Sequence, residues 1–332
     1  MNKKKWFFFL FLIGTLTFGL SACKQDQELQ TVRVAEVTRS IFYAPQYVAI
    51  EKGFFDDEGI NIELTTTWGG DKTMTTLLSN GADVALVGSE TTIYVYAQGA
   101  SDPVINFAQL TQTDGSFLVT RKPIDNFTWD QLKGTTFLGQ RKGGMPQMVG
   151  EFVLKQHGID PQNDIHLIQN IEFANIANAF ASGTGDFVQL FEPTASIFEK
   201  EGIGYIIASF GEESGHVPYT TYMAKQSLIQ EDADLIEKFT RAIYRGQQWV
   251  ETHYPKEIAQ VIQPYFEDTS LDIIETVVER YQQQGSYATN PILDEEEWNH
   301  LQDIMEEASE LPKRIPHSVL VNTEIAEKVV NE

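Results

Sequence analysis

The chain contains a single cysteine, Cys23, among its 332 residues. One cysteine excludes an intrachain disulfide and any zinc site built from several thiolates. Basic side chains are also scarce, because 24 lysines and arginines stand against 47 aspartates and glutamates, for a formal net charge of −23. Since phosphate backbones are bound by Lys and Arg, this balance excludes a nucleic-acid-binding protein. Hydrophobic residues, at 42%, suffice for one large or two ordinary domains.

Signatures of catalysis are missing as well. The six histidines, at positions 157, 166, 216, 253, 300 and 317, do not have metal-ligand spacing. The sequence also lacks His-Glu-x-x-His, Gly-x-Ser-x-Gly and Gly-x-Gly-x-x-Gly motifs. We therefore expect no cofactor, no metal and no enzymatic activity. An extracellular enzyme and a surface adhesin are the alternatives from other functional classes.

Long apolar runs are confined to the N-terminus. Three lysines precede an apolar run from Trp6 to Leu20, which is short for a membrane span and has the length of a signal-peptide core. Small residues then lead to Cys23, an arrangement that resembles a bacterial lipoprotein signal. We predict a signal peptide over 1–22, a lipid on Cys23 and a polar tether over 23–30. The protein would then be anchored on the extracytoplasmic face of the cell membrane, the alternative being an uncleaved anchor.

Strands and helices are predicted to alternate after residue 30. Apolar residues alternate with polar ones over 31–37, a second strand is predicted over 60–67, and a buried strand over 82–88, with helical segments between them. This alternation predicts an α/β fold with mostly parallel sheets flanked by helices. Ligands of such sheets bind beyond the carboxyl ends of the strands.

An internal repeat suggests two similar halves. NGADVALVGSETT (80–92) aligns with GTGDFVQLFEPTA (183–195), which places Asp83 on Asp186 and Ser89 on Glu192. Any two strand–helix units share some similarity, but here the surrounding order of elements also repeats. Two such halves predict two lobes whose strand ends face each other, and pockets favour such interfaces.

Four segments carry a family resemblance: YAPQYVAIEKGFFDDEGINIEL (43–64), NGADVALVGSE (80–90), RKGGMPQMVGEFVLKQHGI (141–159) and FEP (191–193). Together they resemble substrate-binding proteins of ABC transporters, in the superfamily that binds nitrate, sulfonates or taurine, and thiamine pyrimidine precursors. The cysteine-rich motif of the related pyrimidine synthases is absent.

The resemblance implies a type II periplasmic-binding-protein fold, with two α/β lobes joined by two crossing segments. On this chain, lobe one would be 31–115 plus 222–332, and lobe two 116–221. A small molecule between the lobes would favour their closure. The implied partners are a membrane permease and its ATPase, with the binding protein itself a monomer.

Candidate ligand contacts follow the predicted strand ends, where each has an ordinary structural alternative. Phe42, Tyr43, Trp68 and Phe191 would form aromatic walls or else pack internally. Ser89 would contact the ligand or else cap a helix, and Glu90 would contact it or else interact with the helix dipole. Asp71 is expected to be a helix N-cap. Glycine turns offer backbone N–H groups, and a carboxylate at the end of lobe two would accept hydrogen bonds from an amine. The predicted ligand-binding residues are Phe42, Tyr43, Trp68, Gly70, Ser89, Glu90, Thr113, Gly143, Gly144, Phe191 and Glu192.

Aromatic side chains beside Glu90 and Glu192 favour a flat, amine-bearing heterocycle such as a thiamine pyrimidine precursor. Arg39, Lys72, Arg141 and Lys142 lie near the same predicted loops. An alkanesulfonate, taurine or nitrate is therefore the alternative ligand.

Overall fold

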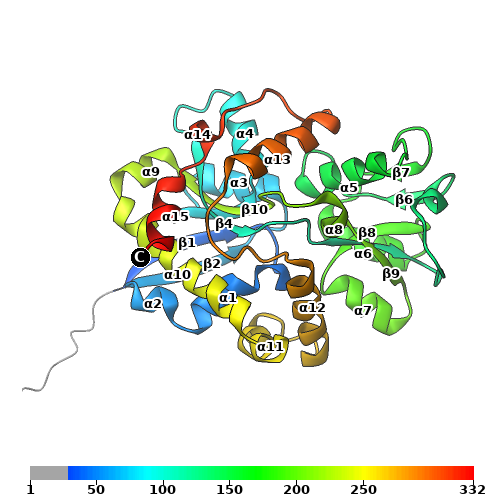
Figure 1. Ribbon diagram of the computed structural model, residues 1–332, viewed down its shortest axis with the longest axis horizontal. Helices are drawn as coiled ribbons and strands as arrows, with labels where there is room; N and C mark the ends of the chain where they lie inside the picture. Colours follow the sequence, from blue (N-terminus) through cyan, green and yellow to red (C-terminus); the bar gives the residue numbers. More distant parts are fainter. Residues whose placement is uncertain (1–28) are drawn as a thin grey trace, which may run out of the picture.

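A computed structural model describes residues 29–332, in which helices and strands alternate around two mixed sheets (Figure 1). The predicted signal peptide, Cys23 and nearly all of the predicted tether lie outside the described residues. The apolar faces of the two sheets must be buried, and helices with an apolar face cover them. This packing gives the α/β architecture.

The first sheet has the order β2-β1-β3-β10-β4. Its strands β1, β2 and β3 pair in parallel, whereas β10 is antiparallel to both of its neighbours. The strand bounds are β1 (Gln30–Glu36), β2 (Ile60–Thr66), β3 (Val84–Gly88), β4 (Val104–Thr111) and β10 (Thr220–Lys225).

The second sheet has the order β7-β6-β8-β5-β9, in which β5 alone runs antiparallel to its neighbours. Its strands are β5 (Ser116–Thr120), β6 (Thr136–Leu138), β7 (His166–Ile168), β8 (Phe187–Phe191) and β9 (Tyr205–Ser209). All five strands lie within 116–221, the range predicted for lobe two.

The two sheets repeat one arrangement. In the first, Asp83 before β3 accepts a hydrogen bond from the backbone N–H of Arg33 in β1 at 2.9 Å. In the second, Asp186 before β8 accepts from the N–H of Thr136 in β6, also at 2.9 Å. The internal repeat in the sequence therefore corresponds to equivalent strands, with each aspartate holding the start of the neighbouring strand.

Helices cover both sheets and are shared between the halves of the molecule (Figure 1). Around the first sheet lie α1 (Ala44–Glu51), α2 (Phe54–Asp57), α3 (Gly70–Leu78), α4 (Glu90–Ala97), α9 (Gln226–Glu231), α10 (Ala233–Thr252), α14 (His317–Leu320) and α15 (Thr323–Val330). The second sheet is flanked by α5 (Met145–Gln156), α6 (Ile176–Ala181), α7 (Thr194–Glu201) and α8 (Phe210–Ser214). The remaining helices are α11 (Pro255–Ile262), α12 (Leu271–Gln284) and α13 (Glu295–Glu307). Four short 3-10 segments complete the described chain, at Ile41–Tyr43, Trp129–Leu132, Phe173–Asn175 and Gln263–Tyr265.

Helix α10 packs closely on α1 because Gly246 carries no side chain. A Cβ atom at Gly246 would stand 2.4 Å from the backbone oxygen of Pro45, at the start of α1. Such a separation is far below van der Waals contact, so glycine sets the distance between the two helices. This packing places the loop before α1 against the edge of the first sheet.

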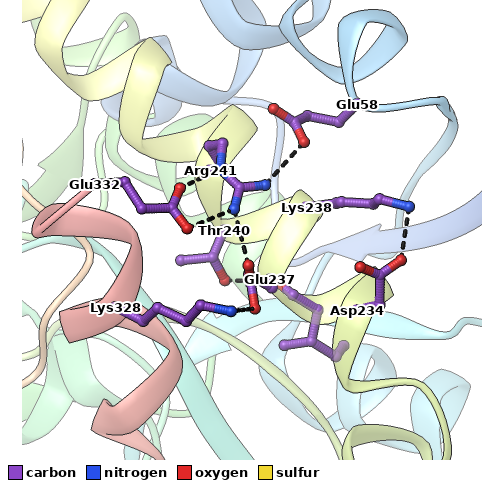
Figure 2. Close-up of polar contacts among 9 residues, drawn as sticks. Glu58, Asp234, Glu237, Lys238, Thr240, Arg241, Lys328 and Glu332 are labelled. Atoms are coloured by element: carbon purple, nitrogen blue, oxygen red, sulfur yellow. Dashed lines mark hydrogen bonds and ion pairs between the residues drawn. The ribbon is translucent and has the colours of Figure 1, made fainter.

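The C-terminal helix is held by an ion-pair network (Figure 2). Arg241 of α10 donates hydrogen bonds to Glu332 at 2.6 and 2.9 Å and to Glu58 at 3.0 Å. Glu237, one turn earlier, accepts from both Arg241 and Lys328. Because one guanidinium joins three segments distant in sequence, the network fastens α15 to α10 and to the end of α2.

Strand β4 was not predicted. It is buried along its whole length, but Asn106, Gln109 and Thr111 interrupt its apolar run. The Asn106 side chain donates hydrogen bonds to Thr92 and to the backbone oxygen of Leu320. Such buried polar side chains interrupt the apolar pattern from which a strand is predicted, and their partners lie far away in the sequence.

Candidate functional site

A cavity of about 580 Å³ lies between the loops that follow the strands of the two sheets. Segments after β1, β2 and β3 line it from the first sheet, and segments after β6 and β8 line it from the second. Both sheets therefore turn the carboxyl ends of parallel strands toward the same space, which is where α/β proteins bind ligands.

Most of the predicted ligand-binding residues meet at this cavity. The structure places the following among its lining residues: Phe42, Tyr43, Trp68, Gly70, Glu90, Gly143, Gly144 and Phe191. Their contact with a ligand stays a prediction, but their gathering from both sheets makes the cavity the candidate site.

Aromatic rings form one wall of the cavity. The ring of Phe42 lies 5.9 Å from that of Tyr43, 5.7 Å from that of Tyr219 and 6.4 Å from that of Phe191, measured between centroids. Phe173 extends the row, with its centroid 5.8 Å from that of Phe191. These rings come from both sheets, so the wall crosses from one to the other; Phe42, Tyr43 and Tyr219 are buried in it, and Phe173 and Phe191 are partly exposed.

A buried carboxylate holds the loop that carries Phe42 and Tyr43. Glu36, at the end of β1, accepts hydrogen bonds from Arg39 at 2.7 Å, Gln46 at 2.9 Å and Tyr47 at 2.9 Å. The guanidinium of Arg39 also lies over the Tyr47 ring. Because the charge is paired and its oxygens are bonded, Glu36 orders the loop instead of facing the cavity.

Trp68 stands at the opening of the cavity with 47% of its surface exposed. Its backbone has φ 59°, the left-handed conformation that a bulky side chain seldom adopts. Nearly half of Trp68 is exposed although its backbone is strained, and such strain clusters at functional sites. We interpret Trp68 as a wall that a ligand covers.

Glu90 is the buried acid of the cavity. It begins α4 with only 3% of its surface exposed, and its Oε1 accepts a hydrogen bond from the backbone N–H of Met145 at 3.2 Å. Among residues 29–332, its Oε2 has no hydrogen-bond partner. Burial raises the pKa of Glu90 to about 8, from an ordinary value of 4.5.

Three helices, α3, α4 and α5, start at the cavity, but side chains already engage their N-terminal N–H groups. The N–H of Met145 donates to Glu90, and that of Gly143 donates to the Gln147 side chain at 3.0 Å. Partial burial acts to raise the pKa of Asp71, yet Arg141 and the backbone N–H of Lys72 lower it overall. Carboxylates of the chain itself thus occupy positions where these helices would hold an anion.

Arg141 bridges the rim of the cavity. It pairs with Asp71 of α3 at 3.0 Å and with Glu172 of the second sheet's half at 3.3 Å. Asp71 is not the N-cap of α3, a position held by Gly69. With both neighbours acidic, the charge of Arg141 is balanced within the protein.

Glu192 does not line the cavity, contrary to our expectation. Its fully buried carboxylate forms an ion pair with Arg280 and accepts hydrogen bonds from the N–H and hydroxyl of Ser196 at 2.8 and 2.9 Å. Phe191, the last residue of β8, lines the cavity, whereas Glu192 lies in the turn that follows and directs its carboxylate toward Ser196 of α7 and Arg280 of α12.

Ser89 and Thr113 also lie off the cavity within the described chain. The Ser89 hydroxyl donates to the backbone oxygen of Pro218, in the segment that returns to β10. The Thr113 hydroxyl lies 3.0 Å from that of Ser286. Both side chains hold crossing segments together. Their partners lie far away in the sequence, so no local pattern predicts these contacts.

The lining also includes residues that were not predicted, among them Tyr94, Gln140, Phe173 and Tyr219. Tyr219 directly precedes β10, whose antiparallel direction brings its amino end to the cavity. A rule restricted to carboxyl ends of strands misses such a residue. Tyr94 lies one turn after Glu90 on α4, and this spacing was the available signal.

No group of three or more His, Cys, Asp and Glu side chains within 29–332 is placed to hold a metal ion. Over the same range, no helix combines the length and apolar character needed to cross a membrane.

The fold has close counterparts among solved structures. The alkanesulfonate-binding protein SsuA from Xanthomonas axonopodis pv. citri, solved with MOPS, superposes with a TM-score of 0.71 at 16% identity, covering 89% of this chain and 99% of that one. The periplasmic nitrate-binding protein NrtA from Synechocystis PCC 6803 gives 0.69 at 15% identity, covering 92% and 89%. At such low identities the likeness establishes the periplasmic-binding-protein fold alone.

Sequence comparison establishes the family. The chain is 67% identical over 317 residues to the "Putative binding protein YtlA" of Bacillus subtilis, covering 96% of this chain and 95% of that protein. The profile of the NMT1-like family matches residues 25–263. This match covers more than half of the chain, and it agrees with the 67% identical relative and with the observed fold. The chain belongs to the NMT1-like family.

Proposed function

We propose that the protein is the extracytoplasmic solute-binding component of an ABC importer. It captures a flat, amine-bearing heterocycle, such as a thiamine pyrimidine precursor, and presents it to a permease and its ATPase. The cavity between the two sheets, walled by aromatic rings and containing the buried Glu90, is the observation that carries the proposal. Support also comes from the family and from the binding-protein name of the 67% identical relative.

The size of the cavity favours an organic ligand. About 580 Å³ falls within the range of about 300–1,000 Å³ typical of pockets for small organic molecules. A nitrate ion would leave most of this volume and the row of aromatic rings without contact. A planar ring would instead stack on the wall around Phe42.

The charges of the cavity favour an N–H donor. Glu90 has a free oxygen, while the helix starts around it are engaged by Asp71 and by Glu90 itself. A sulfonate placed there would compete with carboxylates for the same N–H groups. An alkanesulfonate remains the second candidate, because Arg141 and Lys142 both line the rim.

Replacing Trp68 tests the site together with the ligand class. Thermal unfolding is measured with a panel of aminopyrimidines, taurine, alkanesulfonates and nitrate, and we expect aminopyrimidines to raise the Tm. Trp68→Ala should weaken the best binder about 10- to 100-fold, because a stacked aromatic surface is lost. Tyr254→Ala is the control, since Tyr254 is 78% exposed and lies outside the cavity lining. Stabilisation by taurine or nitrate alone would overturn the proposed ligand.

Membrane attachment through Cys23 is a separate part of the proposal. Cys23→Ala should move the protein from the membrane fraction into the medium, because the lipidated residue is lost. Lys24→Ala, at the neighbouring position, should leave the distribution unchanged. Fractionation followed by immunoblotting measures both. Retention of Cys23→Ala in the membrane would favour an uncleaved anchor instead.

A further inference from the structure

Glu90 is placed between the two halves of the molecule. It belongs to α4, beside the first sheet, yet its Oε1 accepts the N–H of Met145, the first residue of α5 beside the second sheet. Tyr94, on the next turn of α4, also reaches across, with its hydroxyl 3.7 Å from the sulfur of Met148. The carboxyl group that lines the cavity is therefore one of the contacts that joins its two walls.

The second oxygen of this carboxyl group is unused. Oε2 has no partner among the described residues, although burial of an unpaired polar atom costs about 1–3 kcal/mol. Oε2 lies against Gly88, which also lines the cavity, in the space that a Cβ atom at that position would occupy. An acceptor kept free in a ligand-sized cavity is a feature that a bound donor would explain.

Within the described chain, the groups that line the cavity with Glu90 do not include a cation paired with it. Three tyrosines line the same cavity: Tyr43 before α1, Tyr94 on α4 and Tyr219 before β10. The cations of the lining, Arg141 and Lys142, belong to the other half, and Arg141 is paired with Asp71 and Glu172. Glu310, a further acid, also lines the cavity. No resident cation completes the pair with Glu90 within the described chain.

We infer that Glu90, in its ionised form, determines ligand specificity by accepting an N–H hydrogen bond from the ligand on Oε2 while Oε1 holds the N–H of Met145. Ligand recognition and the joining of the two halves would thus share one carboxyl group. The inference rests on the proposed function and deepens it, since it names the group that selects amine-bearing rings.

Glutamine at this position separates the two roles. Glu90→Gln keeps the size of the side chain but retains only one acceptor oxygen. If that oxygen accepts from Met145, the amide NH₂ faces the ligand's N–H; if it turns to the ligand, the NH₂ faces the N–H of Met145. Either orientation sets two donors against each other, so the variant cannot satisfy both partners.

The experiment is isothermal titration at pH 8.5 with two matched probes, 4-amino-2-methylpyrimidine and 2,4-dimethylpyrimidine. We expect Glu90→Gln to weaken the amino probe about 10- to 100-fold, as for loss of a charged hydrogen bond, and the dimethyl probe by less than about threefold. Gly88→Ala, which crowds Oε2, should act in the same direction. Glu296→Gln, which removes an exposed acid of α13 outside the cavity lining, should change neither affinity, and thermal unfolding verifies that each variant is folded.

The outcomes separate this inference from the proposed function. Equal losses for both probes, or no loss in Glu90→Gln, would overturn the role of Glu90 while leaving a heterocycle-binding protein. Binding of sulfonates alone would overturn both the inference and the proposed ligand. Absence of binding by every member of the panel would reject the proposed function and the inference with it.

Discussion

Replacing Arg280 by alanine should lower the free energy of unfolding by about 3–5 kcal/mol, because it leaves the buried carboxylate of Glu192 without its cation. Arg280 of α12 pairs with Glu192, hydrogen-bonds to Ser196 at 3.1 Å and lies over the Phe117 ring. After the substitution, Glu192 would keep only its contacts with Ser196. Denaturant unfolding monitored by circular dichroism measures the difference.

A matched control lies between the same two helices. Lys200 of α7 pairs with Asp272 of α12 at 2.9 Å, and both side chains are more than half exposed. Since exposed pairs contribute little, Lys200→Ala should change stability by about 0.5 kcal/mol or less. The double variant Glu192→Gln with Arg280→Met removes both charges and should recover much of the loss. Equal effects of Arg280→Ala and Lys200→Ala would contradict the structural role of Glu192.

Raising the pH from 5 to 8.5 should weaken the protein, by roughly 3–4 kcal/mol through Glu90 alone. In the folded chain, burial raises the pKa of Glu90 to about 8, whereas the ordinary value is 4.5. Between these values the folded state holds a proton that the unfolded state has released. The free energy of unfolding therefore falls as the pH rises, and the fall ends above about pH 8. Asp114, whose pKa burial raises to about 6, adds to the fall at the acidic end of this range.

Glu90→Gln isolates that contribution, because glutamine resembles the protonated acid and does not titrate. Stability of the variant and the parent should agree near pH 5, and the variant should be the more stable at pH 8.5. Unfolding in guanidinium chloride at both pH values provides the comparison. Identical pH dependence of the two proteins would show that Glu90 is not held in its protonated form. The test uses ligand-free protein, so it is independent of the ligand's identity.

Periodicity was sufficient to predict most of the fold. The strands predicted over 31–37, 60–67 and 82–88 correspond to β1, β2 and β3. The internal repeat anticipated the equivalence of Asp83 and Asp186, because these aspartates act within their own strand–helix units. Strand β4 was missed because Asn106 carries a polar side chain into the core, where its partners are Thr92 and the backbone oxygen of Leu320.

The candidate site was predictable to the extent that strand ends determine it. Phe42, Trp68 and Glu90 follow strands of the first sheet and line the cavity as expected. Glu192 was wrongly predicted to line the cavity, because the sequence does not show in which direction a side chain just after Phe191 points. Tyr219 was missed because only the assembled sheet shows that β10 runs in the opposite direction.

Composition and local pattern by themselves determined that this protein is an acidic α/β protein with two related halves and aromatic loops after its strands. Those properties depend on hydrophobic periodicity and turn-forming residues, which act over a few neighbours. Tertiary structure decided which acid faces the cavity, which is paired with a cation and which oxygen is left free. Burial and ion pairing depend on side chains from segments up to hundreds of residues apart, so these distinctions exist only in the folded chain.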